Sequence, residues 1–136
     1  MLFEVQGNAL LAQHKGETLR IEAWGHNSLR VRATMLPDFT GRAWALTEPQ
    51  SESAQISVWE EDIPCGDGTS RQVPCASIQN GAIKAVVNFA GVLTFYRGET
   101  VLLREHFRFY DGTISQESRC LKLPAREWKS VIGGTD

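Results

Sequence analysis

The tryptophans are the side chains of this sequence best suited to binding chemistry. There are four of them: Trp24, Trp44, Trp59 and Trp128. Indole faces stack on sugar rings, and they also anchor protein–protein interfaces. Trp24 falls on the polar side of an arginine-rich alternating segment, so we consider Trp24 and Trp59 as candidate carbohydrate-binding platforms. The competing interpretation is burial under a second layer or a neighbouring domain, because large aromatic residues are mostly buried on average.

A run of three acids, Glu60-Glu61-Asp62, is the densest cluster of carboxylates in the chain. A glycosidase needs two carboxylates at a set separation across a sugar. Three consecutive acids beside Pro64 and Gly66 are more typical of a solvated loop. The sequence also lacks a Gly-x-Ser-x-Gly elbow, a phosphate-binding glycine loop and a metal-binding histidine pair. We therefore assign no catalytic residue.

The cysteines and histidines do not form a metal-binding motif. They are dispersed along the chain at Cys65, Cys75, Cys120, His14, His26 and His106. A structural zinc site needs four ligands at close spacing, so we predict no metal ion and no cofactor. Cys65 and Cys75 could close a short loop by a disulfide. They could equally stay reduced, because an odd cysteine count without a signal peptide fits a reducing compartment.

Composition excludes several classes of partner. The 136 residues are enough for one domain with a core, and 42% hydrophobic residues favour an ordered chain. The net charge is -2 and no two basic residues are adjacent, so there is no basic face for nucleic acid. Apolar runs such as 101–103 are too short to span a membrane, and residues 1–4 do not begin a signal peptide. We expect a cytoplasmic chain that binds neither nucleic acid nor membrane.

Period-two alternation predicts a hairpin over residues 17–35. Its strands are residues 17–24 and 28–35, and Gly25-His26-Asn27 is a three-residue loop. The register sets three favourable pairs opposite one another: Ala23 with Leu29, Ile21 with Val31, and Glu22 with Arg30. It also sets Arg20 against Arg32. This unfavourable pair suggests that a third strand or another domain supplies an acid nearby.

A second block of alternation, residues 76–105, predicts a meander of three hairpins. Asn80-Gly81 is typical of a type I′ turn, which would set Ile78 opposite Ile83. Ala90-Gly91 and the segment 97–99 predict the two following turns.

Proline and glycine divide the rest of the chain into loops and short strands. We predict loops over residues 36–54 and 60–74, with a short strand, 54–59, between them. Further strands are expected over 119–123 and 125–129. No segment has a sustained 3.6-residue period, so the sequence predicts an all-β antiparallel sandwich with little helix.

The order of these segments resembles the N-terminal β-sandwich domain of glycoside hydrolase family 31, which includes α-glucosidases and α-xylosidases. The resemblance spans about residues 17 to 134 and is carried by Ser28–Thr34, Trp44–Pro49, Ala76–Ala85, Gly91–Tyr96 with Leu102–Glu105, and Ala125–Lys129 with Ile132–Gly134. It implies a galactose-mutarotase-like supersandwich. Residues 1–136 would then be a single N-terminal domain that is incomplete at its C-terminal end.

In that family the domain packs on a (β/α)8 barrel, where two aspartates carry out retaining hydrolysis of a terminal α-glycosidic bond. The resemblance places neither aspartate in this chain, and Asp111 and Asp136 do not lie in the barrel motif. It therefore implies a non-catalytic domain that is inactive alone. Such a domain would support the barrel, and with it carbohydrate binding, in an enzyme acting on α-glucosides or α-xylosides in carbohydrate metabolism.

Two other functions remain open from the residues. One is a stand-alone carbohydrate-binding sandwich that uses Trp24 or Trp59 as a stacking platform. The other is a structural domain that associates with itself or other chains through exposed edge strands, because a truncated sandwich leaves edges and an apolar face uncovered.

Overall fold

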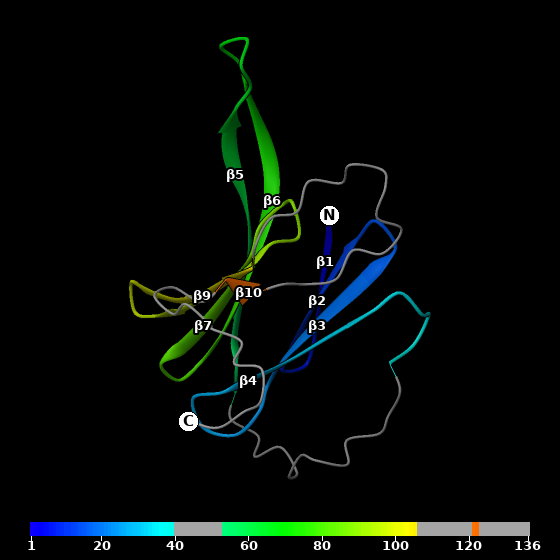
Figure 1. Ribbon diagram of the computed structural model, residues 1–136, viewed down its shortest axis with the longest axis vertical. Coiled ribbons are helices and arrows are strands. Elements are labelled where there is room, and N and C mark those ends of the chain that lie inside the picture. The colour runs from blue at the N-terminus through cyan, green and yellow to red at the C-terminus, as the bar shows by residue number, and fades with distance from the viewer. Residues whose placement is uncertain (40–52, 106–120, 123–136) are drawn as a thin grey trace, which may run out of the picture.

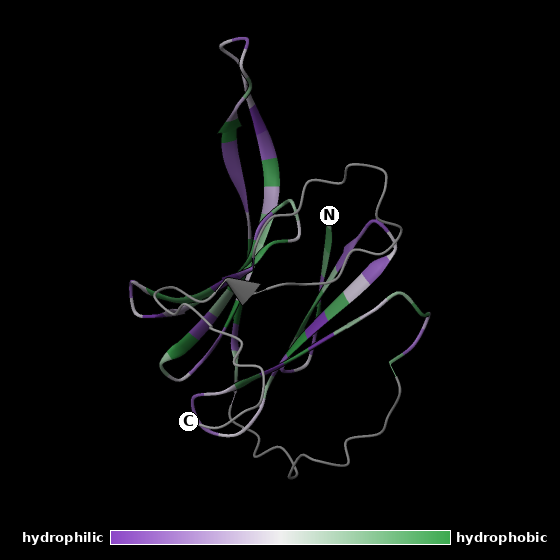
Figure 2. Cartoon of the chain, in the orientation of Figure 1, coloured by the Kyte–Doolittle hydropathy of each residue, from purple (hydrophilic) through white to green (hydrophobic). Residues whose placement is uncertain are grey.

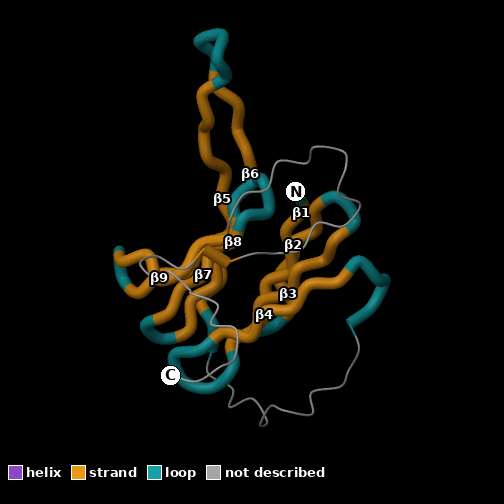
Figure 3. Tube along the Cα trace, viewed as in Figure 1, coloured by secondary structure: helices purple, strands orange, loops and turns teal. Residues whose placement is uncertain are grey.

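Strands dominate the computed structural model, which describes residues 1–39, 53–105 and 121–122 (Figure 1). This part of the chain contains ten strands, and Figure 3 shows only strands, turns and loops in it. Within the same residues, no helix is long and apolar enough to cross a membrane. The strands form two antiparallel sheets. The predicted all-β sandwich is therefore confirmed.

The first sheet follows the chain in the order β1-β2-β3-β4. Its strands are β1 (Leu2–Gln6), β2 (Ala9–His14), β3 (Glu17–Ala23) and β4 (Leu29–Thr34). β3 and β4 form the predicted hairpin in the predicted register, with Ile21 opposite Val31. The three-residue loop is also confirmed, because the Trp24 N–H donates to the Ser28 carbonyl at 3.1 Å.

The second sheet has the order β10-β9-β8-β7-β6-β5. Its strands are β5 (Gln55–Pro64), β6 (Ser70–Asn80), β7 (Ile83–Val87), β8 (Leu93–Arg97), β9 (Thr100–Glu105) and β10 (Leu121–Lys122). Strands β6 to β9 form the predicted meander. The turn between β7 and β8 is closed by Asn88, whose side-chain oxygen accepts hydrogen bonds from the backbone N–H groups of Ala90 and Val92, each at 3.0 Å.

The core lies between the two sheets. It consists of nine buried residues, Leu10, Ala12, Leu19, Ile21, Ala76, Ile78, Ala85, Val87 and Leu93. Burial of one such aliphatic side chain of leucine or isoleucine size contributes about 1.5–3 kcal/mol. On β3 the residues alternate between this core and the outer face, and Figure 2 shows the corresponding alternation of hydrophobic and hydrophilic colour. The polar residues of β3 therefore lie on the outside of the sandwich.

The first two strands were not predicted. Residues 9–12 of β2 are four consecutive buried residues, so the strand has no polar–apolar alternation to detect. β1 was missed because its apolar residues do not all face the core: Leu2 and Val5 are exposed. A continuous apolar run can belong to a buried strand or a buried helix, and periodicity alone does not separate the two.

The predicted loop over residues 60–74 is wrong. β5 continues to Pro64 and β6 begins at Ser70, with ten paired positions between them. The two prolines that favoured a loop are tolerated for a geometric reason. Pro64 ends an edge strand, and Pro74 lies where β6 is paired on one side only, because pairing with β7 begins at Ala76. The part of this hairpin beyond the sheet, residues 59–75, is called the arm and projects away from both sheets (Figure 1).

The register predicted between β6 and β7 is also wrong. Ile78 lies opposite Ala85, while Ile83 lies opposite Asn80. The two-residue turn is therefore Gly81-Ala82, with a positive φ of 57° at the glycine. This matches a turn that needs a positive φ at its first central position only, as in type II′. Asn80 is the last residue of β6 rather than part of the turn, and its buried side chain hydrogen-bonds carbonyls of the β3–β4 turn.

Several predicted segments lie outside the described residues. These are positions 40–52 of the loop predicted over 36–54, and the strand predicted over 125–129. Of the strand predicted over 119–123, the structure describes β10. Trp44, Trp128, Asp111, Asp136, Cys120 and His106 also lie outside the described residues.

Candidate functional site

Trp24, one of the two predicted platforms, follows β3 and is half-buried. The guanidinium carbon of Arg30 lies 4.5 Å from the centre of its ring, which is a cation–π contact. The indole Nε1 is buried and has no acceptor among the described residues. One face of this ring is thus already occupied by a side chain of the same sheet. The geometry favours a packed aromatic residue over an open sugar platform.

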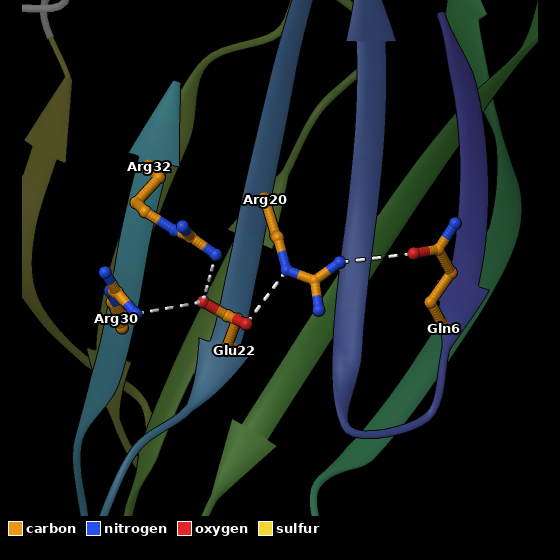
Figure 4. Close-up of polar contacts among 5 residues, drawn as sticks. All are labelled: Gln6, Arg20, Glu22, Arg30 and Arg32. Atoms are coloured by element: carbon orange, nitrogen blue, oxygen red, sulfur yellow. Dashed lines mark hydrogen bonds and ion pairs between the residues drawn. The ribbon is translucent and has the colours of Figure 1, made fainter. Parts of the chain in front are cut away.

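The outer face of β3 and β4 carries a cluster of charges around Glu22 (Figure 4). Its carboxylate lies 2.9 Å from Arg20 Nε, 3.0 Å from an Arg32 guanidinium nitrogen and 3.9 Å from an Arg30 guanidinium nitrogen. From β1, the Gln6 side-chain oxygen accepts a hydrogen bond from Arg20 at 3.2 Å. Three arginines therefore share one carboxylate.

This cluster corrects the inference drawn from the opposed arginines. Arg20 and Arg32 do lie opposite each other. The acid that compensates them is Glu22, on the same strand as Arg20, rather than a residue from a third strand or another domain. Burial by itself would raise the pKa of Glu22, but the hydrogen bonds and positive charges of Arg20 and Arg32 outweigh it. The pKa of this carboxyl is lowered as a result.

Trp59, the second predicted platform, has a different environment. It lies on β5, 38% of its surface is exposed, and it sits opposite Cys75 of β6. Ser57 and Glu61 lie two residues before and after it, so they share its face of the strand. The structure therefore places Trp24 and Trp59 on different sheets, and Trp59 is the more accessible of the two. Its contact with a sugar stays a prediction.

The acidic run lies on a strand rather than in the solvated loop we expected. Glu60, Glu61 and Asp62 are all exposed residues of β5. Because side chains alternate along a strand, Glu61 points to one face, and Glu60 and Asp62 point to the other. The Cys75 thiol donates to the Glu61 carboxylate at 3.5 Å, across the hairpin. The three acids thus do not converge on one point.

Cys65 and Cys75 are free thiols, so the disulfide considered for them is absent. The register explains why. Cys75 lies opposite Trp59. Cys65 directly follows β5 and is six residues beyond Trp59. At about 3.3 Å per residue, the two thiols are separated by roughly 20 Å of strand. Burial raises the pKa of the Cys75 thiol, and the Glu61 carboxylate beside it raises this pKa further.

A shallow hollow of about 620 Å³ opens at the end of the first sheet, next to Met35 and Leu36. It contains neither predicted tryptophan. No group of three or more histidine, cysteine or acidic side chains in the described part of the chain is arranged to hold a metal ion. The described residues therefore present one accessible aromatic side chain and one charge cluster, without a recognisable catalytic arrangement.

Comparison with known proteins decides the family. The chain is 36% identical over 136 residues to a protein of Pseudescherichia vulneris described as an uncharacterized family 31 glucosidase. It also superposes on the crystal structure of a family 31 α-xylosidase from a soil metagenome in complex with xylose, with a TM-score of 0.66 and 36% identity. This chain has the sequence and fold of a domain of glycoside hydrolase family 31. The predicted resemblance is thus confirmed.

The coverage of these matches is strongly asymmetric. The alignment with the glucosidase takes in 93% of this chain but 23% of the glucosidase. The superposition on the xylosidase takes in 80% of this chain and 14% of the xylosidase chain. No protein-family model matches the domain. The domain thus spans less than a quarter of the length of each of these two relatives.

Proposed function

We propose that this chain is a non-catalytic, N-terminal domain of a glycoside hydrolase that acts on α-glucosides or α-xylosides. The observation that carries the proposal is the match of nearly the whole chain to a small part of two family 31 proteins. Its role in the whole enzyme is to support the catalytic barrel. The absence of converging carboxylates among the described residues agrees with that role.

A domain exchange tests this role. The segment of the Pseudescherichia vulneris glucosidase that matches this chain is deleted, or is replaced by this chain. We expect the deletion to abolish soluble, active enzyme and the replacement to restore it, measured with chromogenic α-glucosides and α-xylosides. A replacement that performs no better than the deletion contradicts the proposal. Hydrolysis of either substrate by the purified chain alone contradicts its non-catalytic part.

A second candidate function is direct carbohydrate binding at Trp59. The exposure of its ring, together with hydroxyl and carboxylate groups on the same face of β5, supports it. Titration with glucose, xylose and their α-glycosides should change the tryptophan fluorescence of the native chain, and Trp59→Ala should remove that change. Trp24→Ala is the matched control, because Arg30 already covers the Trp24 ring. No fluorescence change at millimolar sugar excludes this function.

The cytoplasmic location remains a prediction from the sequence. Fractionation of the native host, with detection of the chain by antibody, is the direct test. Recovery in a secreted or membrane fraction would contradict it.

A further inference from the structure

β5 is an edge strand whose outer side is unpaired in the described part of the chain. It hydrogen-bonds β6 and ends the second sheet. Two large apolar residues near its middle are exposed, Val58 at 51% and Trp59 at 38%. They lie on opposite faces of the strand because side chains alternate. A long edge strand with exposed apolar residues is a template for pairing with another strand.

The edge is held in an extended conformation before any partner arrives. Ten consecutive residues of β5 pair with β6, from Gln55 to Pro64. The tip of the arm is closed by Asp67, whose carboxylate accepts hydrogen bonds from the N–H group and the hydroxyl of Thr69 at 3.0 and 2.6 Å. The Cys65 N–H donates to the Thr69 carbonyl at 2.7 Å. A preordered strand loses less conformational entropy on pairing than a flexible one.

We propose that β5 pairs with β5 of a second copy of this chain, antiparallel, about a two-fold axis at Trp59. Two-fold pairing requires a strand that is complementary to itself. Trp59 is the centre of the segment 55–63, so this register uses nearly the whole strand. Gln55 would lie opposite Ile63 of the second copy, and the two Trp59 side chains would be neighbours. The two second sheets would join into one continuous sheet.

Charge selects the register. With the axis at Trp59, each acid faces an uncharged residue of the second copy: Glu60 faces Val58, Glu61 faces Ser57, and Asp62 faces Ile56. Moving the axis to Glu60 or Glu61 sets acids directly opposite acids, which is destabilising. The acidic run therefore disfavours the registers centred on Glu60, Glu61 or Asp62. Moving the axis to Val58 also avoids acid pairs, so the experiment must separate that register from the one proposed.

The test introduces a negative or a positive charge at position 58 and measures dimerisation by sedimentation of the full chain over a wide concentration range. A strand edge is smaller than a standard interface, so we expect a dimer dissociation constant on the order of 10–100 μM for the native chain. Val58→Glu sets two like-charge pairs against Glu60 of the other copy and should weaken the dimer about tenfold. Val58→Lys forms two opposite-charge pairs and should strengthen it. The double variant Val58→Glu with Glu60→Lys should recover the native affinity.

The control is Val101→Glu, at a residue of the same type with 39% exposure on β9, which is flanked by β8 and β10. It should leave the dimer unchanged. Thermal unfolding of each variant shows whether the monomer still folds, and hydrogen exchange should show amides of β5 gaining protection as concentration rises. A monomer at all concentrations up to about 1 mM overturns the proposal. A weaker dimer with both Val58→Glu and Val58→Lys overturns the register centred on Trp59. With an axis at Val58, position 58 of one copy lies opposite position 58 of the other, so either substitution sets two like charges together.

Discussion

Asn27 bonds the turn that follows Asn80, and Asn80 bonds the turn that contains Asn27, so the two side chains connect the ends of the two sheets. Asn27 lies in the β3–β4 turn, and its side-chain oxygen accepts a hydrogen bond from the Ala82 N–H at 2.6 Å. Asn80 ends β6, and its side-chain nitrogen donates to the carbonyls of Gly25 and Ser28, each at 2.7 Å. Two turns more than 50 residues apart in sequence are thereby fixed against each other.

Asn80→Ala should lower the free energy of unfolding by about 2 kcal/mol, since it removes two hydrogen bonds to carbonyls in a partly buried setting. Asn80 itself is 1% exposed, so water does not readily replace its amide. The control is Gln79→Ala, which removes one exposed hydrogen bond to the Gly81 carbonyl and should cost less than about 0.5 kcal/mol. Urea unfolding measures both. Equal losses would show that the link between the turns adds no stability.

Gly81→Ala should cost more than Gly98→Ala, although both glycines have nearly the same φ, 57° and 58°. An added methyl at Gly81 would collide with the Asn27 side-chain oxygen, whereas nothing lies within 4 Å of one at Gly98. Alanine at positive φ costs about 1–2 kcal/mol at either position. At Gly81 the displaced Asn27 also loses its bond to Ala82, which adds about 1 kcal/mol.

The same collision gives a check by double-mutant cycle. Combining Gly81→Ala with Asn27→Gly removes the obstacle while keeping a residue that accepts the φ of 52° at position 27. The double variant should therefore be more stable than the sum of the single losses predicts. Strict additivity would mean that the two residues do not interact.

Glu22→Gln should destabilise the chain by about 2 kcal/mol, because it leaves three guanidinium groups clustered without a carboxylate. Glu99→Gln, on the exposed turn between β8 and β9, is the matched control and should have little effect. The measurement is again the free energy of unfolding. High salt should reduce the difference, since screening weakens interactions between partly exposed charges.

The stability that Glu22 contributes should depend on acid pH. Its pKa in the folded chain is lowered below the ordinary value of 4.5, so the unfolded chain takes up this proton first as the pH falls. The contribution is complete above about pH 4.5 and is lost as the pH drops through the lowered folded pKa. The stability difference between the native chain and Glu22→Gln should shrink over that range. A difference that stays constant down to pH 2 would contradict this assignment.

The two described thiols should react at different rates. In a Cys120→Ser background, Cys65 should react readily with a thiol reagent, and buried Cys75 should react only when the chain unfolds. The raised pKa of Cys75 reinforces this, since the thiolate is the reactive form. Equal rates in the folded chain would show that the base of the arm opens freely.

Local patterns predicted the elements that depend on neighbouring residues. Alternation from Glu17 to Thr34, with a loop that accepts positive φ at Gly25 and Asn27, sufficed to give the β3–β4 hairpin and its register. A shift of one residue would turn Ile21 and Val31 out of the core, so the pattern strongly disfavours that slip. The family resemblance was likewise visible in the order of such segments along the chain.

Only the tertiary structure decided what depends on distant residues. The sequence predicted an Asn-Gly turn after β6. The Asn80 side chain instead donates hydrogen bonds to the Gly25 and Ser28 carbonyls in the β3–β4 turn, and the residue opposite Ile78 is Ala85 rather than Ile83. The sequence predicted a loop where the arm lies. Both prolines are tolerated in its strands because each lies where the strand is paired on one side only. The arginines around Glu22 appeared to need an acid from elsewhere, yet one carboxylate reaches all three. In each case the arrangement of strands in space outweighs a local preference. For Asn80 the physical reason is that a buried amide N–H is costly without an acceptor, and the fold places two carbonyls beside it.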